Sequence, residues 1–365
     1  MYILIAILVF GFLIFIHELG HYLAARAFHV KIYEFSIGMG PRLLSWTSKK
    51  TGIVYGLRVI PIGGFVSMEG ELSPPDGQAE EQPFESVLGE QTPVGGQAGA
   101  GPLATKPAWQ RLVVHVAGAA MNLFFGFLAA VILTCALTVG GTTVAKFVPV
   151  EGATVTSQEQ GLAVGDTILK VGRERVHIAD QLSYEIMHQG GTDEPIILTV
   201  LRDGEELEIP VVFPSVTEQG QSFGMYDFSV YAEEKTLGVV IKHSFFKSCY
   251  MVEMVWDSVI DLVTGRYGFE AVSGPVGTAT VIADAAKQSF VTLFYLTALI
   301  SVNLGVFNLL PLPALDGGHI FYTLLELITR RRLPEKVVTV LDTVGMFLLL
   351  GLMAVVMLKD IYMLF

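Results

Sequence analysis

The chain has 365 residues, of which 52% are hydrophobic and only 16% are charged. A typical soluble domain carries about 25% charged residues, so the composition favours a membrane protein. The formal net charge is -12, and the sequence shows no basic patch of the kind that binds nucleic acid, so no nucleic-acid partner is expected. The two cysteines, Cys135 and Cys249, are too few for a disulfide framework.

Four long apolar segments are each close to the ~20 residues that a membrane-spanning helix requires. They cover roughly residues 2–26, 112–139, 290–310 and 337–358. The first segment has no positively charged stretch before it and no small-x-small cleavage site after it, so we interpret it as a spanning helix and not as a signal peptide. The lipid bilayer is therefore an expected partner.

Lys and Arg residues near these segments predict their orientation, because positively charged loops stay on the cytoplasmic side. Basic residues follow the first segment, precede the second and lie between the third and the fourth: Arg26, Lys31, Arg42, Lys49, Lys50, Lys106, Arg111, Arg330, Arg331, Arg332 and Lys336. We therefore expect a multi-pass protein of the cell's inner or plasma membrane, with both termini and the acidic region 141–270 outside the cytoplasm.

The connections between the apolar segments differ in character. Residues 51–66 are rich in β-branched residues and glycine, which predicts short strands with a tight turn. Residues 73–105 are rich in Pro, Gly, Gln and Glu, which is typical of a flexible loop. Residues 196–202 and 207–213 predict a hairpin about an Asp-Gly turn, within a small α+β domain that we place at 141–214.

The predicted architecture is an α-helical integral membrane protein with four transmembrane helices, a β-hairpin region and one inserted α+β domain. In chain order its segments are 1–26 (first transmembrane helix), 27–72 (membrane-associated β-hairpin region), 73–105 (flexible loop), 106–140 (second transmembrane helix), 141–214 (α+β domain), 215–289 (amphipathic segment), 290–336 (third transmembrane helix) and 337–365 (fourth transmembrane helix). The motifs that indicate chemistry fall in the first and third of these helices.

The strongest chemical signal is the run His17-Glu18-Leu-Gly-His21 inside the first apolar segment. Two histidines four residues apart lie about 40° apart around a helix, so their nitrogens can bind one metal ion. Glu18 is close enough to act on a metal-bound water, as in zinc metalloproteases. Because ionisable residues inside a membrane are costly and usually functional, we predict that His17 and His21 bind Zn²⁺ and that Glu18 is the catalytic base.

A third ligand is expected at the end of the third apolar segment, in Asn308-Leu-Leu-Pro311-Leu-Pro313-Ala-Leu-Asp316-Gly-Gly-His319. Pro311 and Pro313 interrupt the helix, and irregular backbone at membrane depth is tolerated only where protein buries it or water reaches it. Asp316 and His319 are both candidates for the ligand, and spacing alone does not choose between them.

These two motifs, with the α+β domain between them, resemble the site-2 protease family of intramembrane zinc metalloproteases, and in particular its bacterial RseP-type branch. The resemblance covers nearly the whole chain. It implies that one Zn²⁺ is bound, that Asp316 and not His319 is the third ligand, and that Asn308 shapes the substrate site. It also implies cleavage within transmembrane segments of single-pass membrane proteins, such as anti-sigma factors or remnant signal peptides.

Two further segments resemble features of this family. Residues 62–66 are similar to its membrane-associated β-hairpin loop, which implies that Gly63, Gly64 and Phe65 bind an extended substrate by β-augmentation. Residues 161–171 resemble the Gly-Leu-x-x-Gly-Asp-x-Ile core of bacterial PDZ domains, so the inserted α+β domain is expected to be PDZ-like. We expect this domain to exclude large substrates by size more than to bind peptides.

Other polar residues in or near the apolar segments are expected to have structural rather than catalytic roles. The Gly-Ala-Ala-Met-Asn sequence that ends at Asn122 resembles a packing motif of the family, with alanine in place of the usual proline, so Asn122 is expected to support the site, as Pro311 and Pro313 do. His115 and Asp342 lie in or near apolar segments. We expect both to be buried and hydrogen-bonded rather than catalytic.

Two other functions use the same residues. An inactive membrane scaffold would bind partners through the PDZ-like domain, but it would not need the base Glu18. A metal transporter would use the same ligands, but transporters usually contain internal repeats, and this sequence shows none. A zinc metalloprotease is therefore the preferred hypothesis.

Overall fold

The computed structural model describes residues 2–70, 97, 100–148, 150, 156–192, 194–218, 221–266, 268 and 272–363. The chain forms two compact units, one made of Met1–Gly126 with Gly268–Phe365 and the other of Phe127–Tyr267. Helix α2 begins in the first unit and ends in the second.

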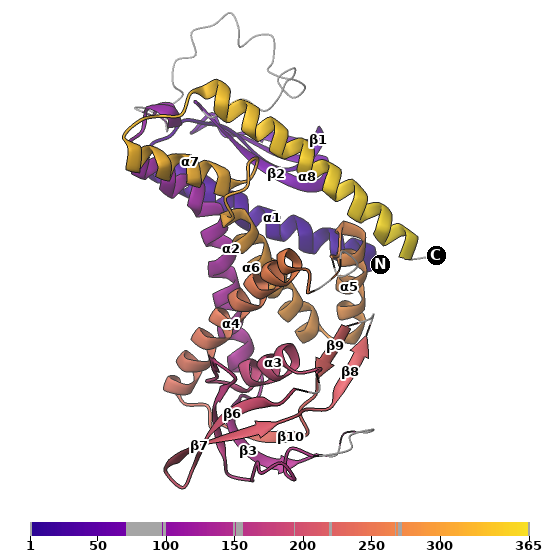
Figure 1. Cartoon of the computed structure of the whole chain (residues 1–365). Helices are drawn as coiled ribbons and strands as arrows, with labels where there is room; N and C mark the ends of the chain where they lie inside the picture. Colours follow the sequence, from indigo (N-terminus) through magenta and orange to yellow (C-terminus); the bar gives the residue numbers. More distant parts are fainter. Residues whose placement is uncertain are drawn as a thin grey trace, which may run out of the picture. The chain divides into compact units, whose positions relative to one another are not determined.

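The first unit is mainly helical (Figure 1). Its elements are α1 (Tyr2–Ala27), β1 (Ile32–Thr47), β2 (Val54–Met68), the short 3₁₀ helix η3 (Leu103–Thr105), α2 (Ala108–Ala136), α5 (Pro275–Gln288), α6 (Phe290–Leu309), α7 (Asp316–Thr329) and α8 (Glu335–Met363). In α1, α2, α6 and α8 the stretches Leu4–Ala27, Ala108–Ala136, Phe290–Leu309 and Glu335–Met363 are long and apolar enough to cross a membrane. The prediction of four such helices is confirmed.

The third apolar helix ends where the apolar segment 290–310 and its two prolines predicted, so the longer segment 290–336 holds two helices. Helix α6 stops at Leu309, and the separate helix α7 begins at Asp316. Pro311 and Pro313 lie between the two helices, where they cannot donate backbone hydrogen bonds. Likewise, helix α5 occupies part of the predicted amphipathic segment 215–289.

Strands β1 and β2 form an antiparallel hairpin whose turn falls at residues 48–53. The predicted pair of short strands within 51–66 is wrong in this respect, since most of that range belongs to β2 alone. Its partner is β1, in which glycines and polar residues obscure the alternation expected of a strand. Of the predicted loop 73–105, residues 73–96, 98 and 99 lie outside the described residues.

The hairpin bends back on itself near Gly38 and Gly40, whose φ angles are 88° and 82°. As a result, residues 34–37 pair on one side with residues 64–67 and on the other side with residues 54–57. Within the described part of the chain, no strand pairs with the other side of residues 64–67, which are therefore an edge of this sheet.

A buried carboxylate fixes the bend. Glu34 accepts hydrogen bonds from Arg42 at 2.7 Å and from Arg58 at 2.9 Å, while Arg58 also donates to the carbonyl of Gly40 at 2.8 Å. Burial alone would raise the pKa of Glu34, but hydrogen bonds from Ser36 and the two guanidinium groups lower it below its ordinary value. The ionised carboxylate thus links the two halves of the hairpin.

The second unit contains an antiparallel six-stranded sheet, a separate two-stranded sheet and two helices. Its elements are β3 (Gly140–Phe147), β4 (Thr167–Val171), β5 (Glu174–Arg175), α3 (Ala179–Gln189), β6 (Ile196–Arg202), β7 (Glu205–Val211), β8 (Ser215–Glu218), β9 (Gln221–Gly224), β10 (Phe228–Ala232) and α4 (Leu237–Thr264). The predicted hairpin of β6 and β7 is confirmed, and its turn residues Asp203 and Gly204 have φ angles of 52° and 86°.

This unit extends beyond the predicted boundary at residue 214. The strands follow the order β10-β3-β4-β6-β7, so β10 pairs with β3 from the other end of the unit. A pairing between such distant segments leaves no local sequence signal. The buried core includes Leu162, Ile168 and Phe228, which come from both sides of that boundary.

The Gly-Leu-x-x-Gly-Asp-x-Ile sequence forms a turn held by its aspartate. Asp166 is almost fully buried and accepts a backbone hydrogen bond from Ala163 at 2.8 Å. Arg202 donates two hydrogen bonds to the same carboxylate, each at 2.6 Å. Gly161 and Gly165 have φ angles of 109° and 95°, which explains why glycine occupies both positions.

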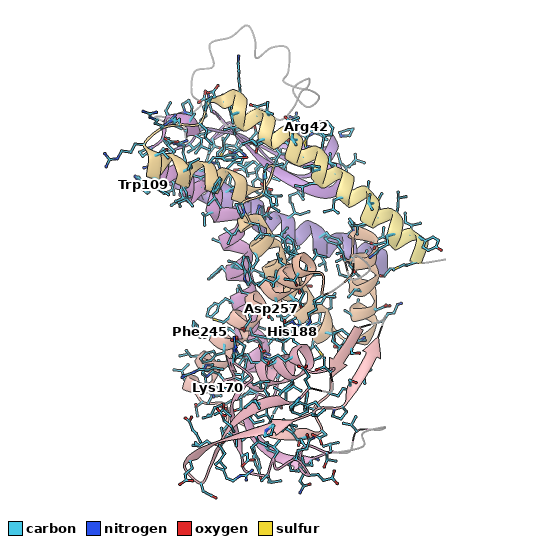
Figure 2. All side chains as sticks on the ribbon, viewed as in Figure 1. Arg42, Trp109, Lys170, His188, Phe245 and Asp257 are labelled. Atoms are coloured by element: carbon cyan, nitrogen blue, oxygen red, sulfur yellow. The ribbon has the colours of Figure 1, made fainter. Side chains whose placement is uncertain are left out.

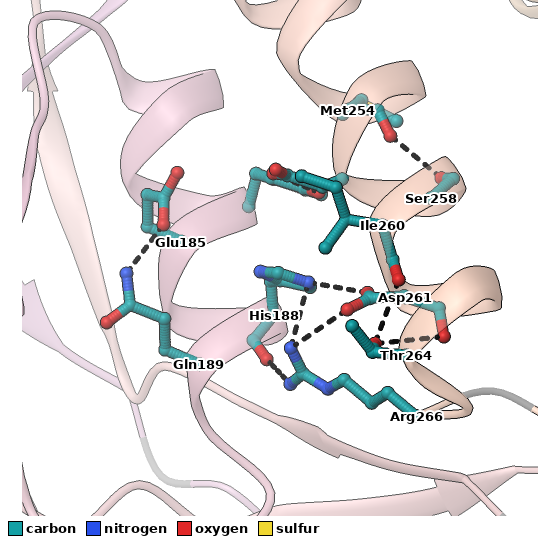
Figure 3. A network of polar contacts seen from close by, with 11 residues as sticks. Glu185, His188, Gln189, Met254, Ser258, Ile260, Asp261, Thr264 and Arg266 are labelled. Carbon is teal, nitrogen blue, oxygen red and sulfur yellow. Dashed lines mark hydrogen bonds and ion pairs between the residues drawn. The ribbon is translucent and has the colours of Figure 1, made fainter.

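Polar contacts join α3 to α4 within the second unit (Figure 3). His188 contacts Asp261 at 2.8 Å, and Arg266 contacts the same imidazole at 3.0 Å. Tyr184 donates a hydrogen bond to Asp257 at 3.1 Å. Figure 2 labels His188 and Asp257, which both belong to this contact. The amphipathic helix predicted over 244–263 is confirmed as part of α4.

Glu185 of α3 should make the stability of the second unit depend on pH. Burial, with repulsion from Glu253 and Glu174, raises the pKa of Glu185 to about 7 from an ordinary value of 4.5. The folded unit therefore holds a proton that the unfolded chain loses, and its stability should fall as pH rises from 4.5 to 7. In E185Q the hydrogen exchange of α3, corrected for intrinsic rates, should lose this dependence. An unchanged pH dependence would contradict the assignment.

Candidate metal centre

Helix α1 presents both histidines on one buried face. His17 is 9% exposed and His21 is 7% exposed. Their Nε2 atoms lie 3.3 Å apart, and the ring planes meet at 78°. The four-residue spacing on a helix brings the two nitrogens together, as the sequence predicted.

Asp316 joins the two histidines from the other end of the chain. It is the first residue of α7, and its Oδ2 lies 3.0 Å from Nε2 of His17 and 3.1 Å from Nε2 of His21. Among the described residues, these three side chains are the only group of three or more that could hold a metal ion.

The donor atoms fit a zinc ion. Zinc bonds to nitrogen and oxygen are about 2.0–2.2 Å long in a tetrahedral site, which puts neighbouring donors about 3.3–3.5 Å apart. The separations of 3.0–3.3 Å between His17, His21 and Asp316 are close to that range. Gly118 leaves room for this arrangement, because a Cβ atom there would lie 2.3 Å from Nε2 of His21 and 2.8 Å from Nε2 of His17.

Hydrogen bonds orient both rings with Nε2 toward the cluster. Nδ1 of His21 donates to the carbonyl of Val114 at 2.8 Å, which leaves Nε2 with a free lone pair. Nδ1 of His17 lies 3.2 Å from the amide nitrogen of the fully buried Asn122, whose Oδ1 has no partner among the described residues. A half-turn of this amide lets Oδ1 accept the Nδ1–H of His17. The unpartnered oxygen therefore suits a metal-binding His17.

Glu18 lies beside the edge of the β1–β2 sheet. A Cβ atom added to Gly64 would lie 3.0 Å from Cγ of Glu18 and 2.8 Å from Cγ2 of Ile14. The absence of a side chain at Gly64 thus lets residues 64–67 approach helix α1. A free strand edge next to a carboxylate is an arrangement that can hold an extended peptide near a base.

The other predicted substrate residues take different positions. Gly63 has a φ angle of 81°, so it bends the strand just before Gly64. Successive residues of a strand point to opposite faces; Phe65 accordingly packs under the guanidinium of Arg58, which lies 4.8 Å from the ring centre. Asn308 donates to the carbonyl of Leu304 in its own helix at 2.9 Å.

His319, the alternative third ligand, faces away from the cluster. Its Nε2 lies 3.7 Å from Oδ2 of Asp342, and its ring stacks on His115 with 5.1 Å between centres. Asp316, in contrast, is held at the cluster by close backbone packing between the start of α7 and the end of α6. A Cβ atom added to Gly317 would overlap the carbonyl oxygen of Leu310 at 1.8 Å.

Sequence reasoning missed the role of Gly20 in this centre. A Cβ atom there would lie 2.2 Å from the carbonyl oxygen of Ala117, so α1 and α2 touch through their backbones. Small residues within apolar helices are the usual signal of such packing. Gly20 on α1 and Gly118 on α2 could have been recognised as a pair on that basis.

Comparisons with known proteins show what this chain is similar to. The family model of Peptidase family M50 matches residues 5–352. A protein of Clostridium perfringens (strain 13 / Type A), to which a zinc metalloprotease activity is attributed, is 35% identical over 99% of this chain and 98% of its own length. The zinc metalloprotease RasP of Geobacillus kaustophilus is 28% identical over 97% and 96% of the two chains. The regulator of sigma-W protease RasP of Bacillus subtilis is 28% identical over 98% of each.

The chain belongs to Peptidase family M50, the site-2 protease family. It is a zinc metalloprotease, and its cofactor is zinc. The four apolar helices agree with a multi-pass membrane protein.

A substitution at Gly118 tests whether the metal centre needs the free space that this glycine leaves beside the two imidazoles. In G118A the new methyl group would collide with both imidazoles, so zinc affinity should fall by about 10–100-fold, as when groups that orient metal ligands are changed. Competition with a chelator measures this affinity. The matched control is G11A, since a Cβ atom at Gly11 meets nothing within 4 Å. Equal affinity in the two variants would contradict the crowding of the centre by residue 118.

Proposed function

We propose that this protease hydrolyses peptide bonds within transmembrane segments of other membrane proteins. In this proposal His17, His21 and Asp316 hold one Zn²⁺, and Glu18 is the catalytic base. The observation that carries it is the position of the three donors. His17 and His21 lie on α1, which is apolar and long enough to span a membrane. Asp316 lies at the end of the loop that follows α6, a second helix of this kind.

The chemistry follows from these residues. Bound zinc would lower the pKa of a water molecule and polarise the scissile carbonyl. Glu18 takes a proton from the attacking water and passes it to the leaving amine. Asn122 and the carbonyl of Val114 keep the two imidazoles in the orientation that the ion needs.

The substrate would bind as an extended strand. A helical peptide bond is shielded by its own backbone, so a transmembrane segment must unwind before cleavage, and its freed polar groups then need partners. The unpaired edge at residues 64–67, next to Glu18, offers such partners. We propose that Gly63, Gly64 and Phe65 form this part of the site and that Asn308 borders it.

The loop between α6 and α7 would support the site. Pro311 and Pro313 prevent α6 from continuing, so the chain turns and begins α7 at Asp316. A loop without regular hydrogen bonding at this depth also gives water a place to reach the reacting bond.

We further propose that the second unit is PDZ-like and lies outside the cytoplasm, and that it restricts access by the size of the substrate. Single-pass membrane proteins such as anti-sigma factors or remnant signal peptides are the expected substrates. The similarity to the regulator of sigma-W protease of Bacillus subtilis supports a role in signalling. The active site would face the cytoplasmic side, since the basic residues next to the spans predict that orientation.

E18Q tests the proposed chemistry. The variant should keep its zinc, because the ligands are unchanged, and lose cleavage of a model transmembrane substrate by about 100-fold or more, because no base accepts the proton of the water. Zinc content and peptide products are measured on the same purified sample. Cleavage close to the wild-type rate would exclude Glu18 as the base.

The third ligand is tested by comparing two substitutions. D316N should weaken zinc binding by more than the ~10–100-fold typical of changes around a metal site, because an amide is a poorer ligand than a carboxylate. H319A should have a much smaller effect, since His319 faces Asp342. The reverse order would assign the ligand to His319.

The orientation is tested with single cysteines at Ser48, in the turn of the β1–β2 hairpin, and at Ser215 of β8. A membrane-impermeant thiol reagent applied to intact cells should label only the second site. A background variant with Cys135 and Cys249 replaced by serine serves as the control. Labelling of both sites from the same side would overturn the proposed topology.

A further inference from the structure

We infer that Asp342, on helix α8, is a positioning residue that fixes the backbone leading to Asp316. The inference rests on the proposed role of Asp316 as a zinc ligand. It gives the fourth apolar helix, which supplies no donor to the cluster, a defined part in shaping the metal centre.

Asp342 is an acidic residue inside a helix that is long and apolar enough to span a membrane. Ionisable residues in such helices are expensive and usually have a defined partner. Here the side chain is 20% exposed, and its partners come from the segment around Asp316. Asp342 was expected to be buried and hydrogen-bonded; it is hydrogen-bonded but only partly buried, and its partners show what the carboxylate does.

Three groups converge on this carboxylate. Oδ1 accepts the backbone N–H of Ala314 at 3.2 Å and the hydroxyl of Tyr322 at 3.3 Å. Oδ2 lies 3.7 Å from Nε2 of His319. Ala314 belongs to the α6–α7 loop, while Tyr322 and His319 belong to α7, so one side chain of α8 joins both parts of the segment that carries Asp316.

The contact with Ala314 matters most, because Ala314 is strained. Its φ angle is 67°, in the left-handed region that residues with a Cβ atom rarely adopt. Such a conformation persists only where the surroundings hold it. Here it reverses the chain just two residues before Asp316, and the carboxylate of Asp342 holds the peptide N–H in the required direction.

Close packing transmits this constraint to the ligand. Gly345, one turn beyond Asp342 on α8, is buried, and a Cβ atom there would lie 2.8 Å from the carbonyl oxygen of Pro313. Gly318 would similarly meet the carbonyl oxygen of Leu312 at 2.7 Å. Because these glycines hold the loop backbone closely against α7 and α8, a change in the Ala314 peptide should displace the first turn of α7, and Asp316 with it.

The test measures zinc affinity by competition with a chelator in the purified full-length protein. D342A should bind zinc about 10–100-fold more weakly, the usual effect of removing a group that orients a metal ligand. In the metal-free protein, the amides of peptide 310–318 should exchange faster with deuterium. D342N should restore both properties, because the amide oxygen still accepts the N–H of Ala314.

Two control variants separate positioning from general damage. Asp360 on the same helix accepts the backbone N–H groups of Gly274 and Gly277 at 3.0 and 2.7 Å, so D360A removes a similar contact far from the loop. It should leave zinc affinity unchanged. Y322F removes only one of the groups that meet Asp342 and should have little effect. Equal loss in D342A and D360A would overturn the inference.

A double variant separates this inference from the proposed function. If Asp342 acts through Asp316, D342A should add no further loss of affinity to D316N. Additive losses, or normal affinity and exchange in D342A, would overturn the positioning role. Normal zinc affinity in D316N would instead refute the proposed ligand set.

Discussion

The structure depends on the convergence of three side chains that are far apart in the sequence. His17 and His21 come from the first helix and Asp316 from the beginning of α7, yet their donor atoms lie within 3.0–3.3 Å of one another. An aspartate and two imidazoles would be expensive in an apolar environment without a shared partner. A bound cation would satisfy all three, and the helices that carry them hold the donor atoms at this distance.

Glycine residues allow the close backbone packing that brings these donor atoms together. Gly20 and Gly118 bring α1 and α2 together around the imidazoles, and Gly317 and Gly345 compress the loop that presents Asp316. The same principle brings the edge of the β1–β2 sheet to Glu18, because Gly64 has no side chain to keep it away. The proposed metal ligands, the proposed base and the strand edge are therefore positioned by backbone contacts, and the site should be sensitive to single methyl groups.

The sequence predicted what local pattern determines. Helical spacing gave the histidine pair, hydropathy gave the four apolar helices, and an Asp-Gly turn gave the hairpin of β6 and β7. Both strands of the β1–β2 hairpin fall within the predicted region 27–72, but the sequence did not place β1, since the bend at Gly38 and Gly40 interrupts its alternation. Two other features depend on contacts between segments that are distant in the sequence: the pairing of β10 with β3 and the hydrogen bond from Ala314 to Asp342. No local pattern contains them.

The proposed metal centre is tested most directly by zinc X-ray absorption on the purified, zinc-loaded protein. Three protein ligands and one solvent oxygen should give about two nitrogens and two oxygens at about 2.0–2.2 Å, with the multiple-scattering features of two imidazoles. The imidazole signal should halve in H21A and stay unchanged in H319A. A sulfur ligand, six oxygens or a third imidazole would contradict a centre built from His17, His21 and Asp316.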